Sequence, residues 1–215
     1  MHSDDDSDED EILQKQFKII LLGDGSVGKT SIAKRFSQDS FAPTYKQTVG
    51  VDFLVKRLNM PPNHSVTMQL WDIGGQSIGS KMVTKYIAGA HAVLLCYDIT
   101  NHESFANLED WYRLVLNTFE GETMPVCALI ANKTDLKHVS QVRMDDHLKF
   151  CKENSFISFM ISAKSGDQIQ LAFWKVAAQL IGTPDMTPAT GVVLDNIPAI
   201  IINSKQHDDN VQGGS

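Results

Sequence analysis

An eight-residue segment near the start of the chain, Gly23–Thr30, constrains the fold and chemistry of this protein most strongly. It reads GDGSVGKT and fits the pattern Gly-x-x-x-x-Gly-Lys-Ser/Thr. It follows the apolar run Phe17–Leu22, which predicts a buried strand, and precedes Ser31–Ser37, which predicts a helix. Glycines let the backbone curl with its N–H groups pointing inward, and the helix N-terminus adds unpaired donors. The segment therefore predicts a phosphate-binding loop.

Two side chains at the end of this loop have expected roles toward a phosphorylated ligand. The Lys29 ammonium can reach β- and γ-phosphates and stabilise charge during their transfer, and the Thr30 hydroxyl can ligate Mg²⁺. The backbone of the loop supplies further donors. The residues expected to contact a nucleotide here are Gly25, Ser26, Val27, Gly28, Lys29, Thr30 and Ser31.

Strand-like apolar runs alternate with helix-like periods along the rest of the chain. Two strands around a Pro-Pro pair predict an antiparallel hairpin. Because strands and helices alternate elsewhere, we expect an α/β layered fold with a mostly parallel sheet. The expected strands are 17–22, 51–58, 66–72, 92–97, 126–131 and 156–161, and the expected helices include 31–37, 103–118, 144–154 and 169–181.

A short polar segment follows the second strand of the hairpin. Asp72 ends this strand and can hold Mg²⁺ through a water molecule, since this cation prefers oxygen ligands. Gly75 can offer a backbone N–H to a γ-phosphate, and Gln76 can orient a water for in-line attack. Such a segment alone is an ordinary turn, but its position after the phosphate loop and the hairpin makes it a candidate catalytic segment.

Two further loops predict which base is recognised. Asn132–Asp135 reads NKTD, and its final carboxylate can accept hydrogen bonds from guanine N1–H and the exocyclic amine. Adenine lacks this donor pair, which predicts discrimination on the order of 10⁴-fold. Ser162–Lys164 also follows a strand, and its middle N–H can donate to guanine O6. The residues expected to bind the nucleotide here are Asn132, Lys133, Asp135, Ser162, Ala163 and Lys164.

The polar loop between the first helix and the hairpin carries two more candidates. Thr48 can ligate Mg²⁺ and touch the γ-phosphate, and that contact disappears when the phosphate leaves. Phe41 can pack edgewise on the base. A surface aromatic that covers the core is an equally good interpretation of Phe41 taken alone.

Composition and charge exclude several function classes. The formal net charge is −7, but seven of the 26 acidic residues lie within 4–11, and the remaining 19 match the 19 basic residues. The charges of this remainder balance, so it lacks the basic excess that would predict a nucleic-acid-binding surface. The three cysteines lack the spacing of a zinc site. No apolar stretch is long enough to predict a membrane-spanning helix. We expect an acidic disordered tail over 1–14, a nucleotide-binding domain over 15–182 and a flexible tail over 183–215.

Taken in order, these motifs resemble the Ras-like small GTPases over roughly 17–181. Within that group the chain is similar to the Rab branch, and the segment Trp71–Met82 resembles a divergent member of it. The segments that carry the Rab resemblance are Thr48–Phe53, Leu70–Asp72, Tyr86–Ala90 and Leu95–Thr100.

The resemblance implies a P-loop NTPase fold of three layers, whose six-stranded sheet has the order 2-3-1-4-5-6 with strand 2 antiparallel. It implies slow hydrolysis of GTP to GDP and phosphate with Mg²⁺, and switch loops near Phe41–Val49 and Gly74–Tyr86. Effector proteins, an exchange factor and a GTPase-activating protein are the implied partners of an expected monomer. A cytoplasmic location is implied, with peripheral association with endosomal or other intracellular membranes in vesicle traffic. The residues matching the Rab effector contacts are Phe53, Trp71 and Tyr86.

The chain departs from the Rab pattern in two places. Gly74 and Gly79 are extra glycines near the catalytic segment, and we expect them to loosen this switch. Rabs usually end in prenylated cysteines, whereas no cysteine lies beyond Cys151 here, so prenylation at this end is not expected. The sequence leaves open whether the protein lacks a lipid anchor or has a trimmed end.

Two alternatives to a GTPase switch fit some of the residues. A scaffold that binds GTP with negligible hydrolysis fits the unusual switch glycines, although Gln76 argues against it. A P-loop kinase or ATPase of another class fits the phosphate loop, but Asp135 and Ala163 argue against adenine.

Overall fold

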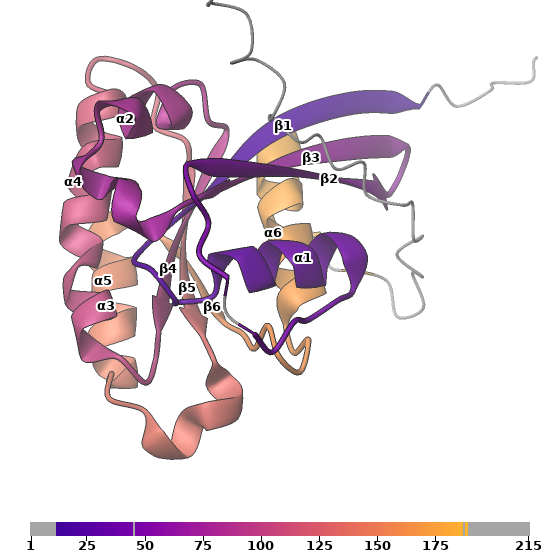
Figure 1. Ribbon diagram of the computed structural model, residues 1–215. Coiled ribbons are helices and arrows are strands. Elements are labelled where there is room, and N and C mark those ends of the chain that lie inside the picture. Colours follow the sequence, from indigo (N-terminus) through magenta and orange to yellow (C-terminus); the bar gives the residue numbers. More distant parts are fainter. Residues whose placement is uncertain (1–11, 45, 187, 189–215) are drawn as a thin grey trace, which may run out of the picture.

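The computed structural model describes residues 12–44, 46–186 and 188, drawn in colour in Figure 1. The acidic run of the N-terminal segment and nearly all of the expected C-terminal tail lie outside the described residues. The described chain forms one twisted sheet with helices on both faces, so its layers are helix, sheet and helix (Figure 1).

Six strands form this sheet in the order β2-β3-β1-β4-β5-β6. β1 pairs in parallel with β3 and β4, and β5 pairs in parallel with β4 and β6. Only β2 runs antiparallel, beside β3, so the strand order and direction implied by the family resemblance are confirmed. The strands are β1 (Leu13–Leu22), β2 (Val51–Met60), β3 (His64–Ile73), β4 (Ala92–Asp98), β5 (Val126–Asn132) and β6 (Ile157–Met160).

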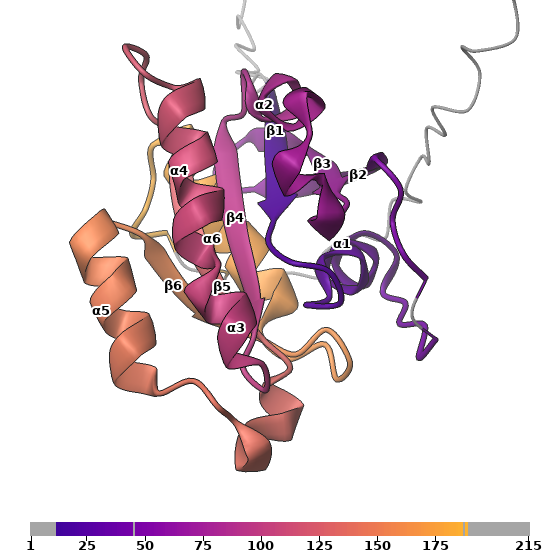
Figure 2. The same cartoon turned by 60° about the vertical axis from the view of Figure 1, so that its left-hand side comes forward.

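The central strand β1 is apolar without alternation because both faces of the sheet are covered. Ile19 and Leu21 pack into the core beneath α1 and α6, whereas Ile20 and Leu22 pack into the core beneath α2 to α5. In Figure 2, α3 and α4 of this second layer lie in front of the sheet. The α-helices are α1 (Lys29–Gln38), α2 (Lys81–Ile87), α3 (His102–Ala106), α4 (Leu108–Thr118), α5 (Met144–Asn154) and α6 (Ile169–Ile181).

The first strand begins at Leu13, earlier than the apolar run suggested. Leu13 pairs with His64 of β3, and its N–H donates to the carbonyl of Asn63 at 2.8 Å. The residues before Phe17 are polar or exposed, so they carry no hydrophobic signal. The long β2–β3 hairpin, and not local burial, extends this strand.

Two helical segments differ from the expectations. The helix expected over 103–118 is divided at Asn107, whose side-chain amide donates to Asp24 at 2.7 Å. The segment after the catalytic glycines forms a 3₁₀ turn, Gly75–Gly79, and then α2. The Ser80 hydroxyl caps α2 by accepting from the Met82 N–H at 3.2 Å.

A buried histidine ties α5 to the sheet. His147 is fully buried, and its Nδ1 lies 3.1 Å from the Tyr97 hydroxyl while its Nε2 lies 2.7 Å from the Ser158 hydroxyl. The Cys151 sulfur lies 3.8 Å from the same Nε2. Burial lowers the pKa of His147 to about 4, so the folded protein holds this imidazole neutral over most of the acidic range.

The lowered pKa predicts a loss of stability in mild acid. As the pH falls from about 6.5 to about 4, the unfolded imidazole takes up a proton that the folded one does not. The free energy of unfolding should therefore fall over this range, with up to about 3 kcal/mol due to His147. Urea unfolding at several pH values should show a smaller fall in His147→Gln. The exposed His102→Gln is the matched control, and an equal fall in both variants would contradict the assignment.

Candidate functional site

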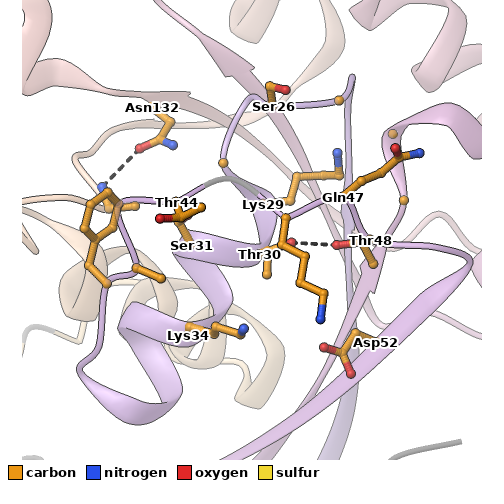
Figure 3. A pocket seen from close by; sticks show the side chains of 18 of the residues that line it. Ser26, Lys29, Thr30, Ser31, Lys34, Thr44, Gln47, Thr48, Asp52 and Asn132 are labelled. Atoms are coloured by element: carbon orange, nitrogen blue, oxygen red, sulfur yellow. Dashed lines mark hydrogen bonds between the residues drawn. The ribbon is translucent and has the colours of Figure 1, made fainter. Parts of the chain in front are cut away.

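Five loops that are far apart in the sequence line one cavity at the carboxyl ends of the parallel strands. Its volume is about 920 Å³. Figure 3 shows Lys29, Thr30 and Thr48 on one side of the cavity and Asn132 on the other. Such an edge is where parallel α/β sheets bind ligands. The expected residues that line the cavity are Gly25, Ser26, Gly28, Lys29, Thr30, Ser31, Phe41, Thr48, Gly75, Gln76, Asn132, Lys133, Asp135, Ala163 and Lys164.

Three expected residues lie behind the cavity wall instead. Val27 is buried in the core beneath α1, and its carbonyl accepts from the Asn132 amide at 2.8 Å. Ser162 is buried and donates to Asp135 Oδ1 at 2.7 Å. Asp72 is fully buried below Thr30. Their side chains therefore support the residues that line the cavity.

The phosphate loop is folded around the ammonium of Lys29. Its Nζ donates to the carbonyls of Gly23 and Asp24 at 2.6 and 2.7 Å, and the side chain is nearly buried. Burial lowers the pKa of Lys29, and the opposing charge of Asp72 raises it again. A Cβ at Gly28, where φ is +99°, would lie 2.4 Å from the Asn132 amide nitrogen, so glycine is required there.

The start of α1 leaves its backbone donors free for an anion. No side chain among the described residues caps the helix, and no acidic residue occupies its first turn. The first N–H groups of a helix have no intrahelical partner and carry partial positive charge. Together with the ammonium of Lys29, these donors make the loop a binding site for phosphate groups.

Three oxygen-bearing side chains from different elements meet beside this loop. The Thr30 hydroxyl lies 2.9 Å from the Thr48 hydroxyl and donates to Asp72 Oδ2 at 2.5 Å. The Thr48 hydroxyl also lies 3.3 Å from Asp72 Oδ2. Burial raises the pKa of Asp72, and its bonds to the two hydroxyls oppose this shift.

The donor set fits magnesium. Asp72 Oδ1 is a buried acceptor with no partner among the described residues, so it has a lone pair for a metal-bound water. The described part of the chain contains no cluster of three His, Cys, Asp or Glu that could cage a metal by itself. Mg²⁺ does not require such a cage, because it usually keeps several waters and binds through one or two protein oxygens plus substrate phosphates.

The glycines of the catalytic segment lie against the loops that they face. A Cβ on Gly75 would lie 2.1 Å from the Gly25 nitrogen, and one on Gly74 would lie 2.5 Å from the Thr48 carbonyl oxygen. The Gly74 N–H donates to Gly50 at 2.9 Å. This packing requires glycine at position 74, and the expectation that Gly74 loosens this switch stays a prediction. At Gly79 the space is open, and that prediction stands untested.

The glutamine of this segment is bonded to the facing loop. Gln47 Nε2 donates to Gln76 Oε1 at 2.7 Å. Both glutamines line the cavity, and sequence reasoning overlooked Gln47. The bond directs the Gln76 carboxamide toward the Thr48 loop, which is the side of the cavity where the metal-binding oxygens lie.

The two loops expected to read the base are bonded to each other. Asp135 accepts from the Ser162 hydroxyl, and its second carboxylate oxygen lies 3.9 Å from Lys164 Nζ. Ala163 N–H donates to Asn132 Oδ1 at 3.1 Å, so a bond to guanine O6 would have to share this donor. Lys133 forms a 2.6 Å ion pair with Asp98, the last residue of β4.

Two supporting residues were missed by sequence reasoning. Asp24 accepts from Asn107 at 2.7 Å and from the indole N–H of Trp111 at 2.9 Å. Arg35 has a mostly buried side chain and donates to the backbone of the loop around Ala163. Neither residue carries a local signal, because the partners lie far away in the sequence.

The three aromatic residues of the Rab-like effector pattern lie together on the surface of β2, β3 and α2. Trp71 meets Phe53 edge-on at 4.4 Å between ring centroids, and Tyr86 lies 6.4 Å away. The Lys18 ammonium lies 3.9 Å from the centre of the Trp71 ring, a cation–π contact from β1.

The fold and this cavity define a P-loop protein that binds a nucleoside phosphate. The family model described as "Ras family" matches residues 18–182. A Rab-28 of Caenorhabditis elegans is 42% identical over 179 residues, which cover 83% of this chain and 70% of that protein. The Rab-7L1 proteins of Rattus norvegicus and Mus musculus are each 43% identical over 145 residues, which cover 65% of this chain and 69% of those proteins.

The chain therefore belongs to the Ras family, in its Rab branch. Members of this family are GTPases that bind GTP or GDP with Mg²⁺, act as molecular switches and interact with effectors, exchange factors and activating proteins. A scaffold without hydrolysis is not favoured by this kinship. Among the described helices, none is long and apolar enough to cross a membrane.

The Asp24 contacts predict a measurable contribution to stability. In Asp24→Ala, the buried indole N–H of Trp111 and the Asn107 amide lose their acceptor, which should lower the free energy of unfolding by about 1–3 kcal/mol in urea titrations. The exposed Asp110→Ala, which loses only a surface ion pair, should change it by less than about 0.5 kcal/mol. Exact additivity of Asp24→Ala and Trp111→Phe in the double variant would contradict the contact.

Proposed function

We propose that this cavity binds GTP and GDP with the residue roles described below, and that the chain works as a Rab-type switch in intracellular vesicle traffic. The observation that carries the proposal is that Lys29, Gly75 and Asp135, from three distant loops, line a single cavity. The phosphates then lie in the loop Gly23–Thr30 and the base lies between the Asn132 and Ala163 loops. A domain over 15–182 contains every part of this arrangement.

Recognition of guanine is assigned to a carboxylate and to the loop behind it. Asp135 accepts from N1–H and the exocyclic amine, while its other contacts, Ser162 and Lys164, keep it oriented. Asn132 and Ala163 N–H form the edge of the base site, with Lys133 beside them and Phe41 on the opposite side. An adenine in this position would leave the carboxylate without donors.

The metal is assigned to the hydroxyls of Thr30 and Thr48 and, through water, to Asp72. Bound there, Mg²⁺ would neutralise part of the charge on the β- and γ-phosphates. Thr30 belongs to α1, and Thr48 belongs to a loop that can move. Thr48 and Gly75 both contact the γ-phosphate. Loss of the γ-phosphate therefore releases both of their loops, and this release is the switching event.

Hydrolysis in this proposal depends on few groups. Gln76 orients the water whose oxygen attacks the γ-phosphorus, and the bond to the bridging oxygen of GDP breaks. Lys29 and the loop N–H groups stabilise the charge on the transferred group. No arginine of the chain is assigned to the γ-phosphate, so the intrinsic rate should be slow, about 10⁻⁴–10⁻² s⁻¹, until an activating protein assists.

The aromatic cluster of Phe53, Trp71 and Tyr86 is proposed as the effector contact. It adjoins both switch segments, since Phe53 follows the Thr48 loop and Tyr86 lies in α2. The Rab kinship supports a monomer that is cytoplasmic and peripheral on endosomal or other intracellular membranes. The GTP-bound form would recruit effectors there, and an exchange factor would reload it.

The assignment of Asp135 is tested by nucleotide competition. Asp135→Asn replaces an acceptor of two donors with a mixed group, so affinity for GDP should fall by at least about 100-fold while affinity for xanthosine diphosphate should rise. Fluorescent-nucleotide displacement measures both. Asp167→Asn, an exposed aspartate in the neighbouring loop, is the matched control. Unchanged preference in Asp135→Asn would refute the base assignment.

The assignment of Gln76 is tested by single-turnover hydrolysis of GTP. Gln76→Leu removes the group that orients the attacking water, so the rate should fall by at least about tenfold with GTP affinity little changed. Gln14→Leu, at an exposed position early in β1, should leave the rate unaltered. A rate that does not fall in Gln76→Leu, or an unaided wild-type rate far above 10⁻² s⁻¹, would contradict this mechanism.

A further inference from the structure

We propose that Arg35 is a positioning residue for guanine recognition: it holds the backbone of the Ser162–Lys164 loop so that this loop can orient Asn132 and Asp135. Its Nε donates to the Ala163 carbonyl at 3.0 Å, and its Nη2 donates to the Lys164 carbonyl at 2.8 Å. A planar guanidinium can bond two successive carbonyls at once, which a lysine ammonium cannot do with the same geometry. The side chain is only 18% exposed, and its bond to the Ala163 carbonyl is partly buried.

The loop held by Arg35 contacts both base-reading residues. Ser162 Oγ donates to Asp135 Oδ1 at 2.7 Å, and Ala163 N–H donates to Asn132 Oδ1 at 3.1 Å. The carbonyl that Arg35 binds belongs to the same residue whose N–H meets Asn132. A shift of this loop would therefore move the acceptor of the guanine amine and the edge of the base site together.

The position of Arg35 is determined by the packing of α1. The next residue, Phe36, is fully buried and stacks on Phe173 of α6 with 3.9 Å between ring centroids. This anchor fixes the rotation of the helix and directs Arg35 toward the loop. Gly166, where φ is +87°, closes the loop over the Arg35 side chain, and a Cβ there would lie 3.6 Å from Arg35 Cδ.

Arg35 also reaches the segment that leaves α1. Its Nη1 donates to the Asp39 carbonyl and side chain, both at 3.2 Å. Asp39 is largely exposed, so this ion pair contributes little by itself. It lies just before the Phe41–Val49 switch segment, and it gives a second contact that can be removed without touching the carbonyls of the loop.

This inference rests on the proposed function, and the experiment separates the two. Arg35→Met keeps the aliphatic packing and removes every donor, whereas Arg35→Lys keeps the charge. Dissociation of a fluorescent GDP should accelerate at least about tenfold in Arg35→Met and by less in Arg35→Lys. Dissociation of IDP, which lacks the exocyclic amine and so makes one contact fewer to Asp135, should accelerate by a smaller factor, so the preference for GDP over IDP falls.

The hydrolysis step gives the second readout. Single-turnover cleavage at saturating GTP should stay within about twofold of wild type, because the phosphate end of the cavity is unaltered. Arg57→Met, exposed on β2, and Asp39→Ala, which spares the carbonyl bonds, should both retain the GDP-over-IDP preference.

Equal acceleration for GDP and IDP in Arg35→Met, or no acceleration, would overturn the inference. If Arg35→Met fails to fold, Arg35→Lys is measured in its place. A GDP-over-IDP preference in Arg35→Lys equal to that of wild type would also overturn the inference. If wild type itself fails to prefer GDP over ADP, the proposed function fails first.

Discussion

The burial of one ammonium group organises the nucleotide site. Lys29 is nearly removed from water, and the loop carbonyls of Gly23 and Asp24 replace part of its hydration. Asp72 is also buried, and each group opposes the shift that burial causes in the pKa of the other. Two charges held out of water at the end of a sheet are costly unless further partners compensate them. A triphosphate with its cation supplies that compensation, so the loop is built for a ligand of high negative charge.

The remaining loops are held in place by contacts with one another rather than by their own conformational preferences. Asn132 bonds Val27 of the phosphate loop and Ala163 of the base loop, so one side chain links three strand ends. Trp111 and Asn107 hold the phosphate loop from the opposite layer of helices. Sites assembled in this way lose little entropy on binding, because the recognising groups are already oriented.

The catalytic segment, where the chain departs from the usual Rab pattern, serves the same arrangement. Gly74 and Gly75 approach the Thr48 and Gly25 backbones so closely that any side chain would collide with them. The catalytic segment can therefore lie directly on the phosphate loop, and Gln47 bonds Gln76 across the gap. Close backbone packing therefore requires glycine at position 74.

The amino-acid sequence alone determined the layered fold, the order of the motifs and the family, because Gly23–Thr30, Asp72 and Asn132–Asp135 each follow an apolar strand with a local pattern. It also placed α5 and α6 correctly from their hydrophobic periodicity. Only the tertiary structure revealed the roles of Asp24 and Arg35, and the division of the 103–118 helix at Asn107. These features depend on hydrogen bonds between residues more than eighty positions apart, whose geometry is set by how helices pack on the sheet. Periodicity records which face of an element is buried, but not which distant backbone its polar side chains will meet.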